Sequence, residues 1–509
     1  MKIVDSFLNQ FTMYRLTLYF LIGLLFYALV LSFLSFLPYK PLDILISIAL
    51  TVLFSYLSNI IFAKMFKATT NVESVFITAL ILNLIITPKL PLNSGFLILV
   101  SVFAMAVKYF PTIEKRHIFN PAAAAVAAFP LWFPDHSATW WVGTPAMFIP
   151  TLIGGYLLVR KIRRERLVYT FLGAYISLVA GFSIVNSGSF SVLYNTLKII
   201  FLQSPLIFFS CVMLTEPLTS PATKKIRSWY SILVAFLYAS PQIRLFSFAL
   251  TPEWALVGGN IFTYFASPNF RLGLQLLKKV QLTADTVLFT FAPVEQLRFI
   301  PGQYMEWTLP HKGTDSRGNR RYFSLASSPT EPNPMLLVKF YNPSSSYKKA
   351  LLANDNLKLD AASLAGDFTL PEDPLKKLVF IAGGVGIAPF RSMVKYLVDS
   401  GQKRDVTLIF ANRHKEDIMF IDLWKQAEAV GVKTVYVLTD KEHAPSGWQG
   451  RVGHLDEKAV QEIVPDYGTR IFYVSGPQLM VQNFEDVLKK TGVSGKNIIT
   501  DFFPGYAER

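Results

Sequence analysis

Cysteine, histidine and charged residues are all scarce in this chain of 509 residues. The single cysteine, Cys211, excludes disulfides, cysteine-ligated zinc and protein-bound iron–sulfur clusters. Of six histidines, only His117 and His136 lie in the first 270 residues, and the other four show no metal-ligand spacing. A transmembrane haem protein needs histidine pairs on facing helices. We therefore expect no haem, no iron–sulfur cluster and no other metal site.

Positive charge is in excess, and its distribution along the chain tests whether the protein binds nucleic acid. Only 16% of the residues are charged and 52% are hydrophobic, yet the formal net charge is +15. Residues 1–270 hold 19 Lys and Arg against 8 Asp and Glu, so most of the excess lies in the hydrophobic half. A nucleic-acid groove is not expected there, and we predict no nucleic-acid partner.

The first 270 residues consist of apolar stretches separated by short polar loops, which predicts a polytopic α-helical membrane bundle of about ten helices. The candidate spans are 16–36, 42–64, 75–87, 95–107, 119–133, 143–159, 167–186, 195–214, 229–249 and 254–270. If these spans alternate across a bilayer, one side collects fifteen cations and the other side only Lys40 and Lys89. The fifteen are Lys2, Arg15, Lys64, Lys67, Lys108, Lys115, Arg116, Arg160, Lys161, Arg163, Arg164, Arg166, Lys224, Lys225 and Arg227. Positive charge marks the cytoplasmic side, so both termini and everything after residue 270 are expected in the cytoplasm, on a bacterial inner or plasma membrane.

The pattern changes after Arg271. Short alternating runs at 275–282, 286–292, 304–309 and 336–341 predict an antiparallel β-barrel domain over residues 271–371. From Leu378 onward, strands alternate with helical stretches, which predicts a parallel, doubly wound α/β domain over residues 375–509.

The predicted barrel contains the segment Arg-Tyr-Phe-Ser at 321–324. An arginine can pair with a pyrophosphate, an aromatic ring can stack on an isoalloxazine, and a serine can hydrogen-bond near flavin N5. A plain barrel strand would explain the aromatic residues alone. Together with the motifs that follow it, the segment favours a flavin nucleotide.

Two further motifs lie between a predicted strand and a predicted helix. The segment Ile-Ala-Gly-Gly-Val-Gly-Ile-Ala-Pro at 381–389 allows the backbone to approach a pyrophosphate at a helix N-terminus. Its last residue, Pro389, suits a first helical turn. The second is Ser-Gly-Pro-Gln-Leu-Met at 475–480.

In this order and spacing, the three motifs resemble the ferredoxin–NADP reductase superfamily over residues 272–509. The resemblance implies an FAD domain, an NAD(P) domain and catalytic roles for Ser324 and Ser475, where Ser475 replaces the cysteine that this family places beside the nicotinamide. The implied FAD-binding residues are Arg321, Tyr322, Phe323, Ser324, Ser345, Ser346 and Tyr506. The implied NAD(P)-binding residues are Gly383, Gly384, Gly386, Pro389, Asn412, Arg413, Ser475, Gly476, Pro477 and Met480.

A second resemblance concerns the hydrophobic half. The segments FNPAAAA (119–125), HSATWWVG (136–143) and LTEPLTSP (214–221) resemble the D subunit of the Rnf complex and the B subunit of the sodium-pumping NADH:quinone reductase. The resemblance implies a bundle of two repeated halves with flavin in the membrane. The Ser-Gly-Ala-Thr attachment motif is absent from the sequence, which leaves a non-covalent flavin or a quinone. Trp140 and Trp141, in a predicted outer loop, indicate an aromatic belt at the membrane interface.

We therefore expect a membrane-bound flavoprotein oxidoreductase. It would oxidise NAD(P)H through FAD in the cytoplasm and pass electrons to an unknown acceptor in or across the membrane domain. Its partners would be the lipid bilayer, the nicotinamide nucleotide and additional membrane subunits. The alternative is a transporter or lipid-binding module regulated by a redox-sensing reductase domain. NADH and NADPH stay equally open, because the direction of the basic Arg413 is not fixed by the sequence.

Overall fold

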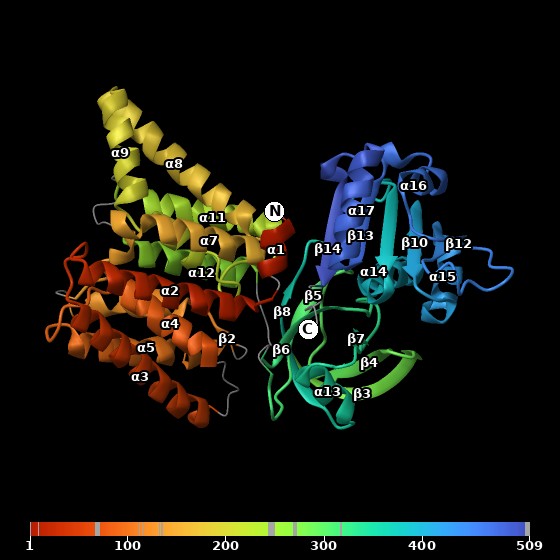
Figure 1. Ribbon diagram of the computed structural model, residues 1–509, viewed down its shortest axis with the longest axis horizontal. Coiled ribbons are helices and arrows are strands. Elements are labelled where there is room, and N and C mark those ends of the chain that lie inside the picture. The colour runs from red at the N-terminus through yellow and green to blue at the C-terminus, as the bar shows by residue number, and fades with distance from the viewer. Residues whose placement is uncertain are drawn as a thin grey trace. The chain divides into compact units, whose positions relative to one another are not determined.

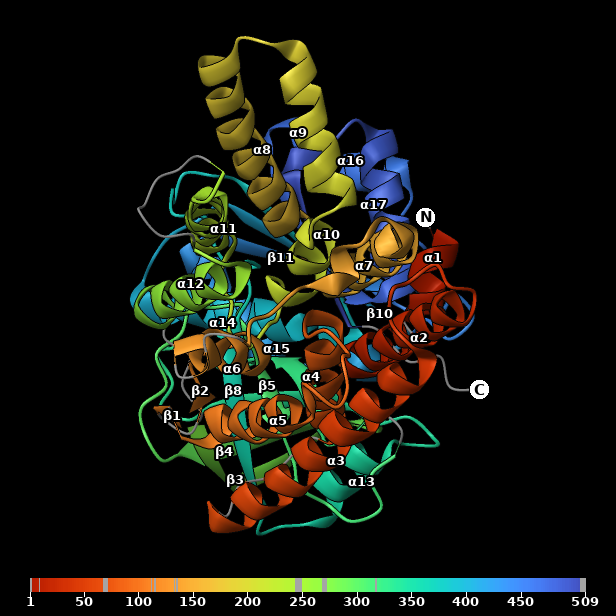
Figure 2. The same ribbon diagram turned by 90° about the vertical axis from the view of Figure 1, so that its left-hand side faces the viewer.

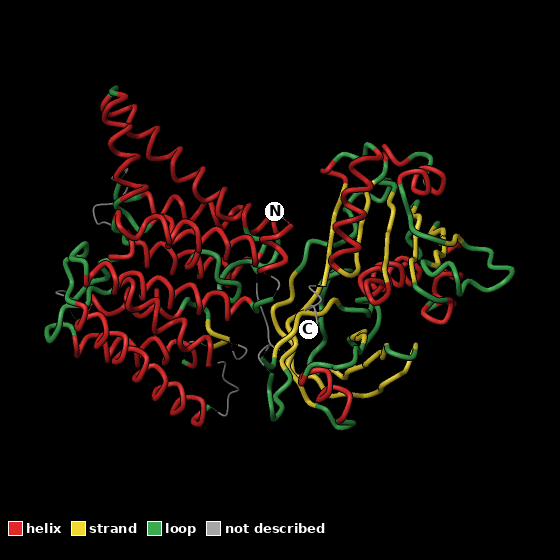
Figure 3. Tube along the Cα trace, in the orientation of Figure 1, coloured by secondary structure: helices red, strands yellow, loops and turns green. Residues whose placement is uncertain are grey.

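The computed structural model divides the chain into two compact units, Met1–Phe270 and Arg271–Arg509. It describes residues 2–8, 10–66, 72–110, 112–113, 116–131, 133, 136–242, 250–267, 272–315 and 318–503. The first unit is built almost entirely from helices and the second contains two sheets (Figures 1 and 3).

The helices of the first unit vary widely in length. They are α1 (Lys2–Leu8), α2 (Met13–Phe33), α3 (Pro41–Met65), α4 (Val72–Ile85), α5 (Ser94–Tyr109), α6 (Pro121–Ala128), α7 (Phe148–Ile162), α8 (Glu165–Ser187), α9 (Phe190–Leu202), α10 (Leu206–Phe208), α11 (Lys224–Ala239) and α12 (Pro252–Ala266). Among the described residues, α2, α3 and α8 are long and apolar enough to cross a membrane. The other predicted spans correspond to shorter or interrupted helices.

The span predicted at 195–214 is interrupted. α9 and the segment Leu206–Met213, which ends in a π-helical turn, are bent by 60° at the break between them. Pro205 lies at the break, where it has no N–H to donate to the preceding turn and its ring would clash with that turn. α8 and α9 form a hairpin that extends beyond the other helices, and its tip exposes Val185 and Phe190 (Figures 1 and 2).

Two sequence motifs of the first unit meet in its core. Asn120 caps α6 by accepting a hydrogen bond from Ala123 N at 3.0 Å, and its Nδ2 donates to Glu216 Oε2 at 2.8 Å. Asn260 on α12 accepts from Asn120 N at 2.8 Å. The alanines that follow Asn120 are small, which allows the neighbouring helices to approach closely.

The predicted aromatic belt at Trp140 and Trp141 is wrong. The two rings are only 5% and 3% exposed, and each indole donates to a buried acceptor. Trp140 Nε1 donates to Glu253 Oε2 at 2.9 Å, and Trp141 Nε1 donates to Asn83 O at 2.6 Å. A buried indole N–H needs such a partner, so these contacts fix the loop against the helices instead of placing it at a lipid interface.

The second unit begins with a curved antiparallel half-barrel. Its strands are β3 (Leu272–Thr283), β4 (Thr286–Pro293), β5 (Tyr304–Thr308), β6 (Arg320–Ser324), β7 (Met335–Lys339) and β8 (Lys358–Ala365), in the spatial order β6-β5-β8-β3-β4-β7. Trp307, Phe289 and Phe291 fill its interior. The helix α13 (Ser346–Ala353) follows β7. Strands of an antiparallel sheet with one buried face alternate between hydrophobic and polar residues. This alternation is the pattern from which the strands were predicted.

The rest of the unit is a parallel sheet with helices between its strands. The strands are β9 (Leu378–Gly383), β10 (Val406–Asn412), β11 (Val432–Leu438), β12 (Arg451–Val452), β13 (Ile471–Pro477) and β14 (Ile498–Phe503), in the order β12-β11-β10-β9-β13-β14. The helices are α14 (Ile387–Ser400), α15 (Ile421–Ala427), α16 (Glu457–Ile463) and α17 (Gln478–Thr491). The strand order reverses between β9 and β13, and ligands of such sheets bind at the carboxyl ends of the strands near that point. The predicted antiparallel β-barrel is present only as a half-barrel, and the predicted parallel sheet that follows it is confirmed.

Candidate functional site

A cavity of about 530 Å³ lies at the carboxyl edge of the parallel sheet. Its lining includes residues at or near the carboxyl ends of four neighbouring strands: Gly383, Gly384, Asn412, Arg413, Val437, Thr439, Pro477 and Met480. The half-barrel supplies the opposite wall with Thr283, Asp285, Thr286 and Lys339. The cavity is therefore shared by the two parts of this unit, at the position that the strand order predicts.

The glycine-rich turn after β9 packs tightly against β13. Gly384 adopts a φ of +53°, which favours glycine. A Cβ at Gly386 would lie 2.3 Å from the carbonyl oxygen of Ser475, so only glycine fits there. This contact brings the turn and the start of α14 beside the end of β13. A turn that leads into a helix N-terminus is suited to bind a phosphate group.

Two polar side chains at this edge are buried and have no hydrogen-bond partner. Asn412 is 4% exposed and lines the cavity, and neither its amide nitrogen nor its amide oxygen is paired. The Ser475 hydroxyl is fully buried and also unpaired. Buried polar groups normally have partners, so the Asn412 amide fits a polar ligand in the cavity, whereas the Ser475 hydroxyl is not part of the cavity wall.

The predicted NAD(P)-binding residues fall into two groups, those that line the cavity and those that do not. Six of them line the cavity, namely Gly383, Gly384, Asn412, Arg413, Pro477 and Met480. Gly386, Pro389, Ser475 and Gly476 lie behind it, where Gly386 packs against Ser475 and Gly476, and Pro389 is buried in the first turn of α14. The role of each residue toward a nucleotide stays a prediction.

The predicted pyrophosphate site of the flavin gathers around Asp315. Arg321 Nη2 lies 3.5 Å from Asp315 Oδ1, and Ser346 N donates to Asp315 Oδ2 at 3.0 Å. The Arg321 guanidinium also lies over the Tyr347 ring, 5.0 Å from its centre. Ser345 caps α13, accepting from Lys348 N at 3.3 Å. The Asp315 carboxylate occupies these donors, so the assignment of Arg321 and the N-terminus of α13 to the anionic part of FAD stays a prediction.

The remaining predicted flavin residues lie on β6. The Phe323 ring centre is 6.1 Å from that of Tyr347, and Phe323 shares its strand face with Arg321. Tyr322 points to the opposite face, where its hydroxyl donates to Glu306 at 2.6 Å. The Ser324 hydroxyl is buried and unpaired, which fits a hydrogen bond to a flavin ring. Tyr506 lies outside the described residues.

No motif in the sequence indicates the barrel residues that line the cavity. Asp285 Oδ2 lies 2.9 Å from Lys339 Nζ. Burial acts to raise the pKa of Asp285, but Lys339 and two threonine hydroxyls outweigh it and hold the pKa below its usual value. Burial likewise acts to lower the pKa of Lys339, and Asp285 outweighs it, so both groups are charged at neutral pH.

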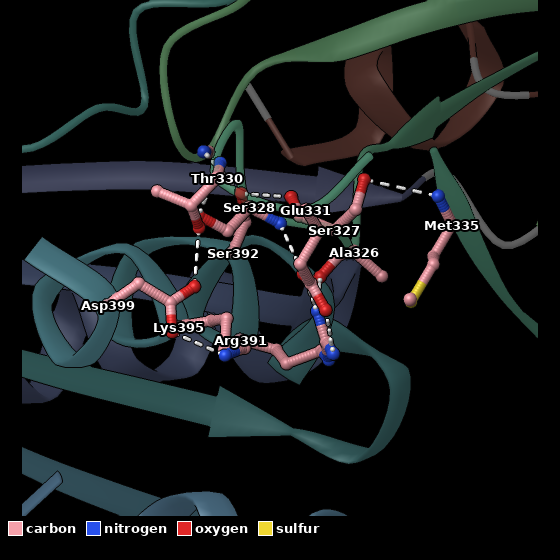
Figure 4. A network of polar contacts seen from close by, with 11 residues as sticks. Ala326, Ser327, Ser328, Thr330, Glu331, Met335, Arg391, Ser392, Lys395 and Asp399 are labelled. Atoms are coloured by element: carbon pink, nitrogen blue, oxygen red, sulfur yellow. Dashed lines mark hydrogen bonds and ion pairs between the residues drawn. The ribbon is translucent and has the colours of Figure 1, made fainter. Parts of the chain in front are cut away.

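A polar network joins the half-barrel to α14 (Figure 4). Arg391 forms two hydrogen bonds with the Glu331 carboxylate, at 2.7 and 2.9 Å, and donates to Ala326 O at 2.7 Å. Ser392 Oγ donates to Ser327 O at 2.6 Å. Ala326 follows Ser324 by two residues and Arg391 follows Pro389 by two residues. The network therefore fixes the strand that carries the predicted flavin serine against the helix that starts at the glycine-rich turn.

Comparisons with known proteins concern this unit. Residues 380–486 match the oxidoreductase NAD-binding domain family. The chain is 25% identical over 231 residues to the glycine betaine monooxygenase reductase subunit of Pseudomonas aeruginosa, covering 44% of this chain and 62% of the relative. It is 28% identical over 233 residues to the propane 2-monooxygenase reductase component of Rhodococcus jostii, covering 44% and 60%. Among solved structures, the Amycolatopsis cytochrome P450 reductase GcoB aligns at 25% identity with a TM-score of 0.42, covering 47% of this chain and 72% of GcoB. The chain thus spans about 60% of the length of these two curated relatives.

The motif order, the half-barrel followed by a parallel sheet, and the NAD-binding family match define the class of the second unit. It is an oxidoreductase domain of the ferredoxin–NADP reductase type, which binds FAD and a nicotinamide nucleotide.

Proposed function

We propose that the chain is a membrane-bound flavoprotein oxidoreductase. It oxidises NAD(P)H with the second unit in the cytoplasm and passes electrons to an acceptor in or across the membrane domain. Either a non-covalent flavin or a quinone in the first unit serves as that acceptor.

One observation carries the reductase half of the proposal. The cavity at the carboxyl edge of the sheet has a glycine-rich turn at one strand end and the unpaired amide of Asn412 at the next. These groups fit a dinucleotide, whose pyrophosphate needs backbone N–H donors and whose rings carry polar edges.

Each residue then has a stated task. Arg321 and the N-terminus of α13 bind the flavin pyrophosphate, and Phe323 packs beside the ring system. The Ser324 hydroxyl donates a hydrogen bond to the flavin, and the Ser475 hydroxyl orients the nicotinamide. FAD, when bound, supplies hydride acceptance and the conversion of two-electron into one-electron transfer.

Three features support the membrane half. The helices α2, α3 and α8 are long and apolar enough to cross a bilayer. The cations of the loops divide fifteen to two when the predicted spans alternate. The motifs that resemble the Rnf D subunit contact one another through Asn120 and Glu216.

A second candidate function is a transporter or lipid-binding module whose reductase domain senses redox state. The observation in its favour is the bend of 60° between α9 and the segment Leu206–Met213. Interrupted helices line the substrate sites of many secondary transporters.

The test uses the detergent-solubilised full chain. We expect an oxidised-flavin absorbance band at about 450 nm that NAD(P)H bleaches under anaerobic conditions. Arg321→Ala should lower the flavin content about tenfold, because it removes a charge-assisted contact to the pyrophosphate. Arg298→Ala, an exposed arginine of the same domain, serves as the control and should retain the flavin.

Reconstitution separates the two candidates. In liposomes, the proposed oxidoreductase reduces an added quinone or a bound second flavin when NAD(P)H is supplied on the side of the second unit. A chain whose FAD is bleached without any membrane acceptor being reduced, and which transports a solute in a redox-dependent way, would support the transporter instead.

A further inference from the structure

The connection between β5 and β6 contacts the predicted pyrophosphate site of the flavin. Its two ends meet where Leu309 N donates to Asn319 O at 2.9 Å. Between these ends, Asp315 lies against Arg321 of β6 and against the N-terminus of α13. We call the described residues of this connection, 309–315 and 318–319, the Asp315 loop.

The Asp315 carboxylate lies where an anion is expected. Its Oδ2 accepts from Ser346 N at 3.0 Å, one of the N–H groups in the first turn of α13 that no helical carbonyl satisfies. Its Oδ1 lies 3.5 Å from Arg321 Nη2, and the two side chains are only 26% and 15% exposed. A helix N-terminus and a guanidinium are also suitable donors for phosphate oxygens. The carboxylate therefore uses the donors that the proposed function assigns to the pyrophosphate of FAD.

Further contacts hold the Asp315 loop at the same two residues. Asp315 N donates to Ser346 Oγ at 2.9 Å, and His311 Nε2 lies 3.0 Å from that oxygen. Arg321 Nη1 donates to Gly318 O at 3.0 Å. Ser346 and Arg321 thus each contact the loop through more than one atom. A pyrophosphate and the Asp315 carboxylate cannot use these donors at the same time.

The other end of β6 differs from this arrangement. The Ser324 hydroxyl, which the proposed function assigns to the flavin ring, is buried and has no hydrogen-bond partner. The Asp315 loop therefore satisfies the donors of the predicted flavin site at its anionic end and leaves the group expected at the ring unpaired.

We propose that Asp315 is an internal substitute for the FAD pyrophosphate. It pairs with Arg321 and the N-terminus of α13 in the flavin-free chain, and FAD displaces it on binding. The inference rests on the proposed function, because it concerns the regulation of the same flavin site. The loop competes with FAD, so the apparent affinity falls with the fraction of chains in which the donors are accessible. A loop that occupies the donors about 90% of the time raises the apparent Kd about tenfold.

Flavin binding to the flavin-free full chain in detergent tests the proposal. Asp315→Asn removes the charge but retains an oxygen for the Ser346 N–H. It should lower the Kd of FAD about tenfold and raise the association rate constant by a similar factor, because fewer chains have to release the loop first. Asp315→Ala should act in the same direction. Fluorescence titration measures the Kd, and stopped-flow fluorescence measures the rate.

Two controls assign the effect to the phosphate donors. Riboflavin has no phosphate and leaves these donors to the carboxylate, so its Kd should be the same in the wild type and in Asp315→Asn. Glu295→Gln, an exposed carboxylate of the half-barrel, should change neither Kd. In an Arg321→Ala background, Asp315→Asn should improve FAD binding less than about threefold, because the two anions then compete only for the helix N-terminus.

The outcomes are distinct. Equal FAD affinity and association rate in the wild type and Asp315→Asn would overturn the proposal, and so would weaker FAD binding by the variant or an equal change for riboflavin. A chain that binds FAD but whose flavin is not bleached by NAD(P)H would contradict the proposed function instead, and the comparison of Kd values would still decide the role of Asp315. Failure of both forms to bind FAD would refute both proposals.

Discussion

Asp466 shows how one side chain connects separate segments of the parallel sheet. Arg470 Nε lies 2.6 Å from Asp466 Oδ1, and Lys377 Nζ, just before β9, lies 2.9 Å from Oδ2. The hydrogen bonds from Arg470 and Lys377 lower the pKa of Asp466 from 3.8 to about 2. Arg470 also pairs with Asp405 at 2.7 Å, so a single guanidinium joins two carboxylates.

The depressed pKa predicts a pH-dependent contribution to stability. Because the folded-state pKa lies below the unfolded one, the contribution is complete above about pH 5 and is lost as the pH falls toward about 2. Asp466→Asn should lower the free energy of unfolding by up to about 1 kcal/mol at pH 7, since the pair is partly exposed, and by about half as much near pH 3, where the folded carboxylate is still largely ionised. Thermal unfolding of the full chain at both pH values measures this. A loss at pH 7 that persists unchanged near pH 3 would contradict the assignment.

Residue types at strand ends were predictable from the sequence, but contacts across the unit were not. Ser324, Ser475 and Asn412 stand in motifs, or directly after a strand, where a ligand was expected. Asp285 lies in an ordinary hairpin turn about 100 residues before the glycine-rich turn, and Lys339 lies in an ordinary strand about 45 residues before it. Only the packing of the half-barrel against the sheet places them at the cavity.

At the scale of elements, the polar network between Glu331 and α14 connects the half-barrel to the parallel sheet domain (Figure 4). The side chains of Arg391 and Glu331 are only 10% and 13% exposed. Removing one partner of such a pair leaves a charge buried without compensation, which typically costs about 3–5 kcal/mol. The pair therefore maintains the relative position of β6 and the glycine-rich turn, and a break in it should affect hydride transfer.

Glu331→Ala should lower stability by about 3 kcal/mol and slow flavin reduction by NAD(P)H. Replacing both partners, as Arg391→Met with Glu331→Met, should cost less than the sum of the single changes. Stopped-flow flavin reduction and thermal unfolding measure the two effects. Lys395→Ala removes the partly exposed pair with Asp399 on the same helix, and it should cost at most about 0.5 kcal/mol. Additive single and double variants would show that the pair has no coupling.

Element types were predictable where the sequence has a clear period. Alternating hydrophobic and polar residues predicted the strands of the half-barrel, because one face of that sheet is buried. Continuous hydrophobic runs predicted the strands of the parallel sheet, because both of its faces are buried. The predicted span 195–214 had the right composition but contains Pro205, which interrupts the helix. The prediction that Trp140 and Trp141 lie at the membrane interface was wrong, because their hydrogen-bond partners, Glu253 and the Asn83 carbonyl, come from helices distant in the sequence.

At the scale of the whole chain, the proposed cytoplasmic position of the reductase unit can be tested with cysteine labelling. Cys211 is the only cysteine and is 7% exposed, so the wild-type chain should react slowly with a maleimide. Lys40→Cys and Lys89→Cys should react with a membrane-impermeant maleimide in intact cells, because both lie in predicted outer loops. Lys225→Cys should react only after the cells are opened. The reverse pattern would invert the proposed topology.

Because the half-barrel and the parallel sheet both line the nucleotide cavity, neither part can be exchanged alone for that of a related protein. Thr283, Asp285, Thr286 and Lys339 come from the half-barrel, while Asn412 and Arg413 come from the sheet. A chimaera that exchanged only the sheet would combine one protein's nucleotide edge with another protein's barrel wall, and would also separate Glu331 from Arg391. The transferable cassette is therefore the whole second unit, Arg271–Arg509, and selection for a new electron donor acts on both of its parts together.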